Sequence, residues 1–316
     1  MKIAMLEPIA VPEALLAELA APLKAAGHEV MLCTAALTAE EKLARAKDAD
    51  VLMIANSPLT ADFVAQCKNA RMISVAFTGV DHLPKETCIA QNIAVCNAQG
   101  YATIAVRDLV FGMVFGLMRN LVPCNDVVRR LGTKDGLVGN EIAGKTFGIV
   151  GYGQIGSAVA KVAAALDCNV IAYTRSKSPG ETDGIARFVS FDEVVTTSDI
   201  LSLHTPLTPE TKAMFGADQF AKMKPTAILI NAARGPVVDS AALAAALNNG
   251  VIAAAGIDVF DIEPPLNADE PLLTAKNTLL APHIGFATKE SMVKRAHIVF
   301  ANVQRWLEGD PQNRQF

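Results

Sequence analysis

The sequence predicts an α/β protein that contains two doubly wound parallel sheets. Three observations lead to this fold class. Over the first hundred residues, short apolar runs alternate with helical patterns; in mid-chain a glycine-rich turn links an apolar run to another helical pattern; and a second alternating series follows. Alternation of this kind is typical of parallel sheets with helices on both faces. With 316 residues, 51% of them hydrophobic, the chain is long enough for two well-cored domains.

The elements of the first series follow from the spacing of apolar residues and from the residues that end each run. Short β-branched or apolar runs are typical of buried strands, and the helical patterns between them close at breakers such as Gly27. These elements make one open α/β domain. The expected strands are 2–6, 29–33, 50–55, 72–77 and 93–96, and the expected helices are 12–26, 38–47, 60–67 and 85–90.

The segment 103–118 is apolar on nearly all sides and is longer than the helices before it. A helix of this kind must be buried on several sides. Two interpretations stay open, a core helix between the two domains and a dimer interface, because periodicity alone does not separate them.

The second series begins with the strand 146–150 and continues to the last helix. Thr208-Pro209 is typical of a helix N-terminus, and the tail 312–316 is expected to be exposed. Further strands are expected at 169–173, 200–204, 227–231, 254–259 and 278–281, and helices at 191–197, 240–247 and 289–307.

Composition and charge exclude several classes of partner. The formal net charge is −4 with acidic and basic residues scattered, so a nucleic-acid partner has no electrostatic footprint. The six cysteines lie far apart without zinc spacing, and they predict reduced thiols and no metal site. The N-terminal apolar run is too short for a signal peptide, and charge or glycine interrupts the longer apolar stretches. We therefore expect a cytoplasmic protein that binds small molecules rather than nucleic acid or a membrane.

The turn Gly151-Tyr152-Gly153-Gln154-Ile155-Gly156 predicts a dinucleotide-binding (Rossmann) domain. It lies between an apolar run and a helical pattern, the context that this motif requires. The first glycine permits the tight turn, the second lets a pyrophosphate approach the backbone, and the third lets the helix pack on the strand. The free N–H groups at the start of the helix favour the diphosphate. We expect cofactor contacts at Gly151, Gly153, Gln154, Ile155 and Gly156.

The residues after the strand 169–173 favour NADP(H) over NAD(H). NAD-preferring domains place Asp or Glu about 20 residues past the glycines, where it binds the ribose 2′-hydroxyl. Thr174, Arg175 and Ser176 stand at that place here, and the next acid is Glu181. A carboxylate would repel a 2′-phosphate, whereas a cation and hydroxyl groups can bind it. A basic loop that is only solvated is the alternative, so NAD(H) stays possible.

Arg234, Glu263 and His283 each follow an apolar strand of the second series. Ligands of open α/β sheets bind at the carboxyl ends of the strands. Arginine can hold a carboxylate bidentately and polarise a neighbouring carbonyl. A histidine beside a carboxylate has its charged form favoured and can donate a proton to the alkoxide that forms when hydride reaches a carbonyl carbon. Each residue alone could be structural, but together, after a dinucleotide turn, they indicate a hydride-transfer site.

Five segments of the chain share their order and spacing with one known family. They are GYGQIGSAVA (151–160), LHTPLTPET (203–211), LINAARGPVVD (229–239), AAGIDVFDIEPP (254–265) and LLAPHIGFAT (279–288). In these segments the chain resembles the D-isomer-specific 2-hydroxyacid dehydrogenases. The resemblance implies a flavodoxin-like substrate domain formed by residues 1–98 and 286–316, with a Rossmann domain, residues 99–285, inserted in it.

The resemblance also implies roles for individual residues. His283 would be the acid/base, Glu263 its partner, and Arg234 the group that binds the substrate carboxylate and carbonyl. Asp258 would meet the nicotinamide carboxamide. The implied cofactor contacts outside the glycine turn and the 174–176 loop are His204, Thr205, Pro206, Ala232 and Asp258.

The substrate carboxylate would bind the backbone N–H groups of the loop that contains Thr78, Gly79 and Val80. Tyr101 and His82 stand where the chain departs from the family pattern, and each could line the pocket or only pack. A further departure is Val-Arg-Asp at 106–108 in place of the usual Val-Ala-Glu. These departures concern the identity of the substrate more than the type of reaction.

The expected function is NADP(H)-dependent reduction of a small 2-oxo acid, of the glyoxylate or hydroxypyruvate type, to the D-2-hydroxy acid by a homodimer. One alternative is an NAD-dependent D-2-hydroxyacid or phosphoglycerate dehydrogenase, although the region 56–87 offers few basic residues for a phosphate. An alternative of another class is a non-catalytic dinucleotide-sensing interaction protein. The presence of Arg234, Glu263 and His283 together argues against it.

Overall fold

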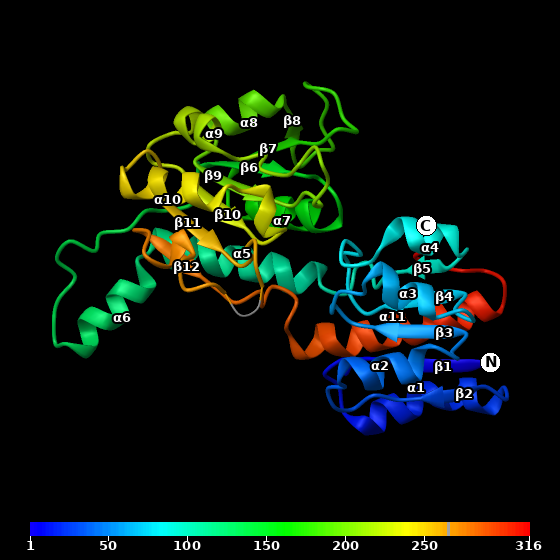
Figure 1. Cartoon of the computed structure of the whole chain (residues 1–316). Coiled ribbons are helices and arrows are strands. Elements are labelled where there is room, and N and C mark those ends of the chain that lie inside the picture. The colour runs from blue at the N-terminus through cyan, green and yellow to red at the C-terminus, as the bar shows by residue number, and fades with distance from the viewer. Residues whose placement is uncertain (264–265) are drawn as a thin grey trace. The chain divides into compact units, whose positions relative to one another are not determined.

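The computed structural model describes residues 1–263 and 266–316, and it divides into two compact units (Figure 1). Unit 1 contains Met1–Ala102 and Ala287–Phe316, and unit 2 contains Thr103–Phe286. Each unit is built on one parallel sheet, so the predicted fold class is confirmed. Pro264 and Pro265, which end one of the family-like segments, lie outside the described residues.

The sheet of unit 1 has the strand order β2-β1-β3-β4-β5, the flavodoxin-like order of a doubly wound fold. Its strands are β1 (Lys2–Met5), β2 (Glu29–Met31), β3 (Val51–Ile54), β4 (Met72–Val75) and β5 (Ala94–Cys96). Its helices are α1 (Glu13–Ala25), α2 (Ala39–Ala46), α3 (Ala61–Gln66), α4 (Lys85–Ala90) and α11 (Lys289–Leu307).

The C-terminal segment belongs to unit 1 through specific hydrogen bonds. The Ser74 hydroxyl of β4 donates to the carbonyl of Val299 on α11, at 3.0 Å. Beyond α11, the backbone of Val95 donates to the carbonyl of Phe316 and accepts from the N–H of Gln315. The tail is therefore bound along β5, because the edge strand offers unpaired backbone groups, and within the expected exposed tail Arg314 and Gln315 are exposed.

The sheet of unit 2 has the order β12-β11-β10-β9-β6-β7-β8, and the chain reverses direction across the sheet between β6 and β9. Its strands are β6 (Thr146–Val150), β7 (Asn169–Tyr173), β8 (Arg187–Phe188), β9 (Ile200–Leu203), β10 (Ile228–Asn231), β11 (Ala254–Ile257) and β12 (Thr278–Leu280). Its helices are α5 (Thr103–Met118), α6 (Leu121–Arg129), α7 (Gln154–Ala165), α8 (Phe191–Thr197), α9 (Ala217–Lys222) and α10 (Ser240–Asn248), with 3-10 turns at Gly235–Val237 and Pro271–Leu273.

The apolar helix α5 is a core helix of unit 2. It packs against α7 and against β10, β11 and β12. The approach is close at Gly116, where a Cβ would lie 2.9 Å from Cδ2 of Leu279. The next helix, α6, differs from it, because none of its residues is buried and it stands apart from the sheet of unit 2 (Figure 1).

The prediction of a helix that begins at Thr208-Pro209 is wrong. The chain makes a single turn there, in which the N–H groups of Thr211 and Lys212 bond to the carbonyl of Thr208. Ala213 then adopts φ +50°, a left-handed conformation that cannot continue a right-handed helix. The helix of this region, α9, begins at Ala217 instead.

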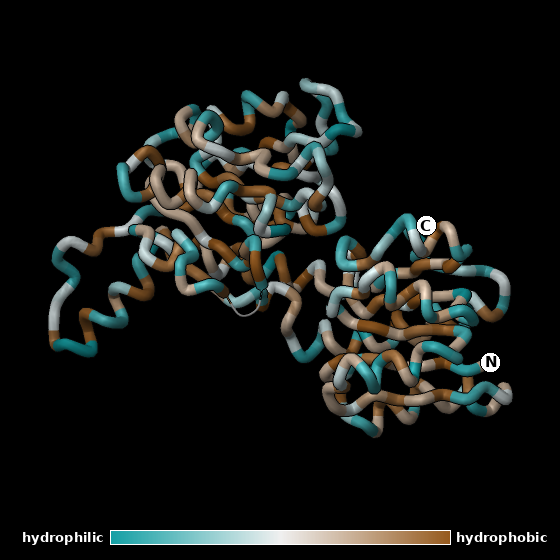
Figure 2. The backbone as a smooth tube through the Cα atoms, viewed as in Figure 1, coloured by the Kyte–Doolittle hydropathy of each residue, from teal (hydrophilic) through white to brown (hydrophobic). Residues whose placement is uncertain are grey.

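Strands and the inner faces of helices form the core of each unit, and most of the central strands appear as hydrophobic segments in Figure 2. Every residue of β3, β4, β9 and β10 is buried, as expected for parallel strands covered on both faces. Among the helices described, none combines the length and the apolar character needed to cross a bilayer.

Candidate active site

The glycine turn after β6 has the geometry of a phosphate-binding turn. Gly151 adopts φ +96°, and a Cβ on it would lie 2.6 Å from the carbonyl oxygen of His204. A Cβ on Gly156 would lie 2.1 Å from the carbonyl oxygen of Gly151, so the start of α7 packs directly on the turn. A Cβ on Gly153 would meet no heavy atom within 4 Å, which leaves open space above this residue. The first and third glycines are thus required by packing, and the second faces room for a ligand.

The residues around this turn fit a dinucleotide. Gly153 is the N-cap of α7, and no side chain caps this end of the helix. The first N–H groups of the helix, beginning with those of Gln154 and Ile155, can therefore donate to a ligand. The hydroxyl oxygen of Thr205 is buried and has no hydrogen-bond partner among the described residues. A buried polar atom of this kind requires a partner, and a bound cofactor would provide one.

His204 lies at the end of β9, beside Gly151. Its Nε2 is 2.9 Å from the hydroxyl of Ser202, and burial lowers the pKa of His204 to about 4. The imidazole is therefore neutral near pH 7. Pro206 follows in the same loop, where its carbonyl accepts a hydrogen bond from the hydroxyl of Thr211, at 2.7 Å.

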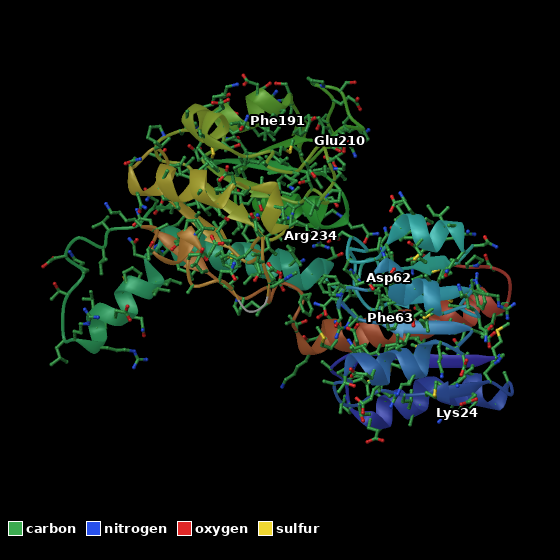
Figure 3. All side chains as sticks on the ribbon, viewed as in Figure 1. Lys24, Asp62, Phe63, Phe191, Glu210 and Arg234 are labelled. Atoms are coloured by element: carbon green, nitrogen blue, oxygen red, sulfur yellow. The ribbon has the colours of Figure 1, made fainter. Side chains whose placement is uncertain are left out.

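The loop after β7 contains the residues that favoured NADP(H). The hydroxyl oxygens of Thr174 and Ser176 lie 3.3 Å apart. Hydrogen bonding to Thr208 lowers the pKa of Glu210, labelled in Figure 3, and the positive charge of Arg175 lowers it further. The charge of Arg175 thus acts on an exposed carboxylate, which would compete with a 2′-phosphate for this cation.

Lys177, the next basic residue of this loop, is already engaged. Its ammonium group forms an ion pair with Glu181 at 3.2 Å and lies 5.9 Å from the centre of the Phe188 ring. Arg175 and the two neighbouring hydroxyl groups are therefore the stronger candidates for contacts to the ribose.

Tyr152 is a residue of this region that sequence reasoning missed. Its hydroxyl donates to Asp183 at 2.6 Å, and its ring packs edge-on against Phe188 with centroids 5.0 Å apart. Asp183 also accepts from the N–H groups of Ile185 and Ala186, at 3.0 and 2.9 Å. These contacts connect the glycine turn to the segment after β7, although a glycine motif treats the position of Tyr152 as a variable spacer.

Arg234, Glu263 and His283 follow three strands that are neighbours in the sheet, β10, β11 and β12. The strand ends are joined by backbone hydrogen bonds, from Asp258 N–H to the Asn231 carbonyl at 2.9 Å and from His283 N–H to the Asp258 carbonyl at 2.8 Å. The three residues predicted to act together therefore lie along one edge of one sheet.

The imidazole of His283 is hydrogen-bonded through Nδ1 to Oε2 of Glu263. The other carboxylate oxygen, Oε1, accepts from the backbone N–H of Phe260, which orients the Glu263 side chain. Because an ionised carboxylate can only accept, Nδ1 carries a proton and Nε2 is the nitrogen at which His283 exchanges one. The side chains of the pair are 23% and 20% exposed, so a substrate can reach a pair that is otherwise mostly covered by protein.

Asp258, predicted as a cofactor contact, supports the backbone beside His283. It is 1% exposed, and its two carboxylate oxygens accept from the N–H groups of Ile284 and Gly285, each at 2.8 Å. Burial raises the pKa of Asp258, and these two hydrogen bonds oppose that shift. The carboxylate therefore orders the turn that carries the imidazole.

Arg234 begins a 3-10 turn and is partly buried (labelled in Figure 3). The Asn231 side chain orders the backbone before it, accepting from Ala233 N–H at 3.1 Å and donating to the Arg234 carbonyl at 3.0 Å. Ala232, another predicted cofactor contact, lies between β10 and Arg234, in the backbone that Asn231 orders. The guanidinium donates to the carbonyl of Ala233 at 2.8 Å.

In unit 1, the loop predicted to bind the substrate carboxylate uses its backbone carbonyl groups, rather than its N–H groups, for hydrogen bonds within the protein. Phe77 accepts from Ala98 N–H at 2.9 Å, and Thr78 accepts from the Asn97 side chain at 2.6 Å. Over the described part of the chain, the backbone N–H groups of Thr78 and Gly79 make no hydrogen bond. These donors remain for a ligand, as the prediction for Thr78, Gly79 and Val80 requires.

Tyr101 packs inside unit 1. It is 3% exposed, and its ring lies 6.3 Å from that of Phe77. Its hydroxyl is hydrogen-bonded to the guanidinium of Arg295. The structure adds a buried arginine beside Tyr101 that the sequence pattern did not single out, and a role of Tyr101 in the substrate pocket stays a prediction.

The comparison with protein families decides the affiliation. The family model described as "D-isomer specific 2-hydroxyacid dehydrogenase, NAD binding domain" matches residues 111–285, more than half of the chain. The protein belongs to the D-isomer-specific 2-hydroxyacid dehydrogenase family. The predicted family and enzyme class are confirmed, and so is a nicotinamide dinucleotide as the cofactor.

Individual members of this dehydrogenase family match along most of the chain. A glycerate dehydrogenase of Methylorubrum extorquens is 39% identical over 90% of this chain and 91% of its own length. A hydroxypyruvate reductase of Blautia hydrogenotrophica is 35% identical over 92% of both chains. Among solved structures, an acyclic imino acid reductase in complex with NADPH and D-Arg is 26% identical, covers 100% of both chains and has a TM-score of 0.90.

Proposed function

We propose that this dehydrogenase reduces a small 2-oxo acid, of the glyoxylate or hydroxypyruvate type, to the D-2-hydroxy acid with NADP(H). The observation that carries the proposal is the His283–Glu263 pair, which lies on the same sheet edge as Arg234. A proton donor and a carboxylate-binding cation on one edge are what reduction of a 2-oxo acid needs.

The residues of the chain would divide the chemistry as follows. The bound nicotinamide supplies the hydride. His283 donates the proton from Nε2 to the oxygen of the former carbonyl, and the carboxylate of Glu263 stabilises the imidazolium before transfer. Arg234 binds the substrate carboxylate and polarises the carbonyl. The N–H groups of the loop 78–80 are proposed as further donors to the substrate carboxylate.

Three observations support the small substrate and the preference for NADP(H). The relatives that match along most of the chain are named for glycerate and hydroxypyruvate, which are three-carbon acids without phosphate. The end of β7 has no carboxylate to accept a ribose 2′-hydroxyl, and it has Arg175 between two hydroxyl groups. The imino acid reductase with the same fold was solved with NADPH, which fits the same preference.

A matrix of cofactors and acids tests this proposal. The protein is mixed with NADPH or NADH and with glyoxylate, hydroxypyruvate or 3-phosphohydroxypyruvate, and the loss of reduced nicotinamide is followed by absorbance. We expect turnover with the two smaller acids, a higher kcat/KM with NADPH, and the D-isomer of glycerate from hydroxypyruvate. A preference for the phosphorylated acid with NADH would support the phosphoglycerate alternative. NADPH binding without turnover of any acid would support the sensing protein.

We also propose that the protein is a cytoplasmic homodimer. Support for the dimer comes from α6 and the segment after it, where large apolar side chains are exposed in unit 2. The exposed set is Leu121, Val122, Val128, Leu131 and Val138. A patch of this kind on a monomer is typical of an interaction surface.

A further inference from the structure

The buried face of α11 contains one charged residue among apolar ones. Arg295 is 4% exposed, and its neighbours on this face include Met292, Ala296, Val299 and Phe300. An amphipathic helix normally places an apolar side chain at such a position. Burial of a guanidinium is costly unless it is hydrogen-bonded, so a charge at this place needs a reason beyond packing.

Arg295 extends to the carboxyl ends of the strands of unit 1. Its Nη2 donates to the carbonyl of Ile9, beyond β1, at 2.8 Å, and its Nη1 donates to the carbonyl of Ala76, directly after β4, at 3.4 Å. The guanidinium carbon lies 5.8 Å from the centre of the Tyr101 ring. In an open parallel sheet this edge is where ligands bind.

The contact with Ala76 bears on the loop proposed to bind the substrate carboxylate. Ala76 is the first residue after β4 and precedes Phe77 and Thr78 in the chain. A hydrogen bond to its carbonyl fixes the peptide from which this loop starts. The loop is therefore ordered from both sides, by Arg295 before it and by the Asn97 side chain at Thr78.

The positive charge of Arg295 is not fully balanced by the acid that acts on it. The acid that acts on Arg295 is Glu7, whose Oε2 accepts from the N–H groups of Asn56 and Ser57, both at 3.2 Å. Its Oε1 lies 3.8 Å from the ammonium group of Lys42. Glu7 is thus shared between Arg295 and Lys42 and cannot neutralise both, and a buried position lets the remaining positive charge of Arg295 act over a longer distance than in water.

We infer that Arg295 is a positioning and specificity-determining residue: it fixes the start of the loop 78–80 and provides the positive charge through which this loop selects substrates with a carboxylate. The inference rests on the proposed role of the loop 78–80. A substrate with a carboxylate benefits from both effects, whereas a neutral ester of the same acid benefits only from the ordered backbone.

Comparison of an acid with its ester separates charge from structure. Kinetics are measured with glyoxylate and with methyl glyoxylate, for the wild type and for Arg295→Met, Arg295→Lys and Arg305→Met. Arg305 lies on the same helix, is exposed and pairs with Asp310, so its substitution is the matched control. We expect Arg295→Met to raise KM for glyoxylate about tenfold or more with kcat within about threefold, and to raise KM for the ester clearly less, since the ester loses only the ordered backbone. Arg295→Lys should recover most of the affinity for the acid, and Arg305→Met should resemble the wild type.

Equal losses for acid and ester, or an unchanged KM for glyoxylate in folded Arg295→Met, would overturn the inference. Should Arg295→Met not fold, Arg295→Gln keeps hydrogen-bond donors without the charge and is expected to show the same selective loss for the acid. If neither variant folds, Arg295 is a structural residue and the inference is wrong. Turnover by the wild type tests the proposed function separately. If the wild type reduces no acid, calorimetric titration of the NADPH complex with oxalate still compares the wild type with the variants.

Discussion

At the residue scale, the site depends on a histidine whose backbone lies in the left-handed region. His283 has φ +53°, and such a conformation in a residue other than glycine costs on the order of 1–3 kcal/mol. Asp258 offsets this cost, because its carbonyl accepts from His283 N–H and its carboxylate accepts from the next two N–H groups. Strained backbone of this kind persists where the surroundings determine it, and it is common at functional sites.

Removal of the imidazole should affect chemistry and leave cofactor binding intact. We expect His283→Ala to lower kcat by about 100- to 10,000-fold, since general acid catalysis contributes in this range. The dissociation constant for NADPH, measured by fluorescence titration, should stay close to that of the wild type. His297→Ala removes an exposed histidine of α11 and serves as the control. Retention of more than a tenth of the wild-type kcat by His283→Ala would contradict the proposed role.

His204 should make stability depend on pH. Its pKa is about 4 in the folded protein against an ordinary value of 6.5, so between these values the unfolded chain binds a proton that the folded protein does not. The contribution of His204 to the free energy of unfolding is therefore complete above pH 6.5. It is lost as the pH falls to 4, and the total loss is about 3 kcal/mol. Urea unfolding at several pH values in this range should therefore give a weaker pH dependence for His204→Gln than for the wild type. Parallel curves for the two proteins would show that His204 also titrates normally when folded.

At the scale of elements, the glycine turn separates packing from ligand binding. Gly156→Ala would place a Cβ 2.1 Å from the Gly151 carbonyl, and we expect it to lower the free energy of unfolding by about 1–3 kcal/mol or more. Gly153→Ala meets no protein atom within 4 Å, so stability should change by less than about 0.5 kcal/mol. Its methyl group would occupy the space proposed for the pyrophosphate, and the dissociation constant for NADPH should rise about tenfold or more. Chemical unfolding and cofactor titration of both variants check this pair, and unchanged NADPH binding by Gly153→Ala would contradict it.

The loop after β7 should decide the choice of cofactor. Arg175→Asp replaces a cation of this loop by a group that repels a 2′-phosphate and can accept from a 2′-hydroxyl. We expect the ratio of kcat/KM for NADPH to that for NADH to fall about tenfold or more. Lys177→Asp is the control, because Lys177 already pairs with Glu181, and the ratio should change less. An unchanged ratio in Arg175→Asp would remove the support for NADP(H).

The sequence predicted most of the sheet elements because buried parallel strands are short apolar runs between recognisable breakers. The helix α5 and the helix α11 have the bounds expected for them, 103–118 and 289–307. Two further elements were missed: α6, which has no buried residue, and β8, which has only two residues. At Thr208 the residues typical of a helix N-terminus are present, but the chain forms only a single turn there.

The candidate site was predictable where it depends on strand ends and less so where it depends on tertiary partners. Three polar residues after three successive strands must share one sheet edge, which explains the placement of Arg234, Glu263 and His283. Arg295 could not be found in this way, since an arginine in an amphipathic helix is ordinarily a surface residue and its partners lie 219 and 286 positions away. Tyr152 likewise acquires its role only through Asp183, 31 positions further on.

At the scale of the whole molecule, α6 lacks the packing that would stabilise it. It has nine residues, and isolated helices shorter than about 12–15 residues are marginal in water. None of its residues is buried. Val128 in the helix is 68% exposed, and Leu131, two residues after its end, is 95% exposed. The missing contacts are therefore expected from a second copy of the chain, which can offer the same apolar surface in return.

The oligomeric state tests this expectation directly. We expect the wild type to have the mass of a dimer by light scattering after size-exclusion chromatography, and Val128→Lys/Leu131→Lys to have that of a monomer, because two lysines would be buried unpaired in the interface. Ile89→Lys, which changes an apolar side chain of unit 1 that is 55% exposed, should leave the dimer intact. Circular dichroism should show less helix in the double variant, since α6 loses its packing partner, while thermal unfolding of the remaining structure stays cooperative. A monomeric wild type would contradict the dimer itself. A double variant that still forms the dimer would place the subunit interface outside this helix.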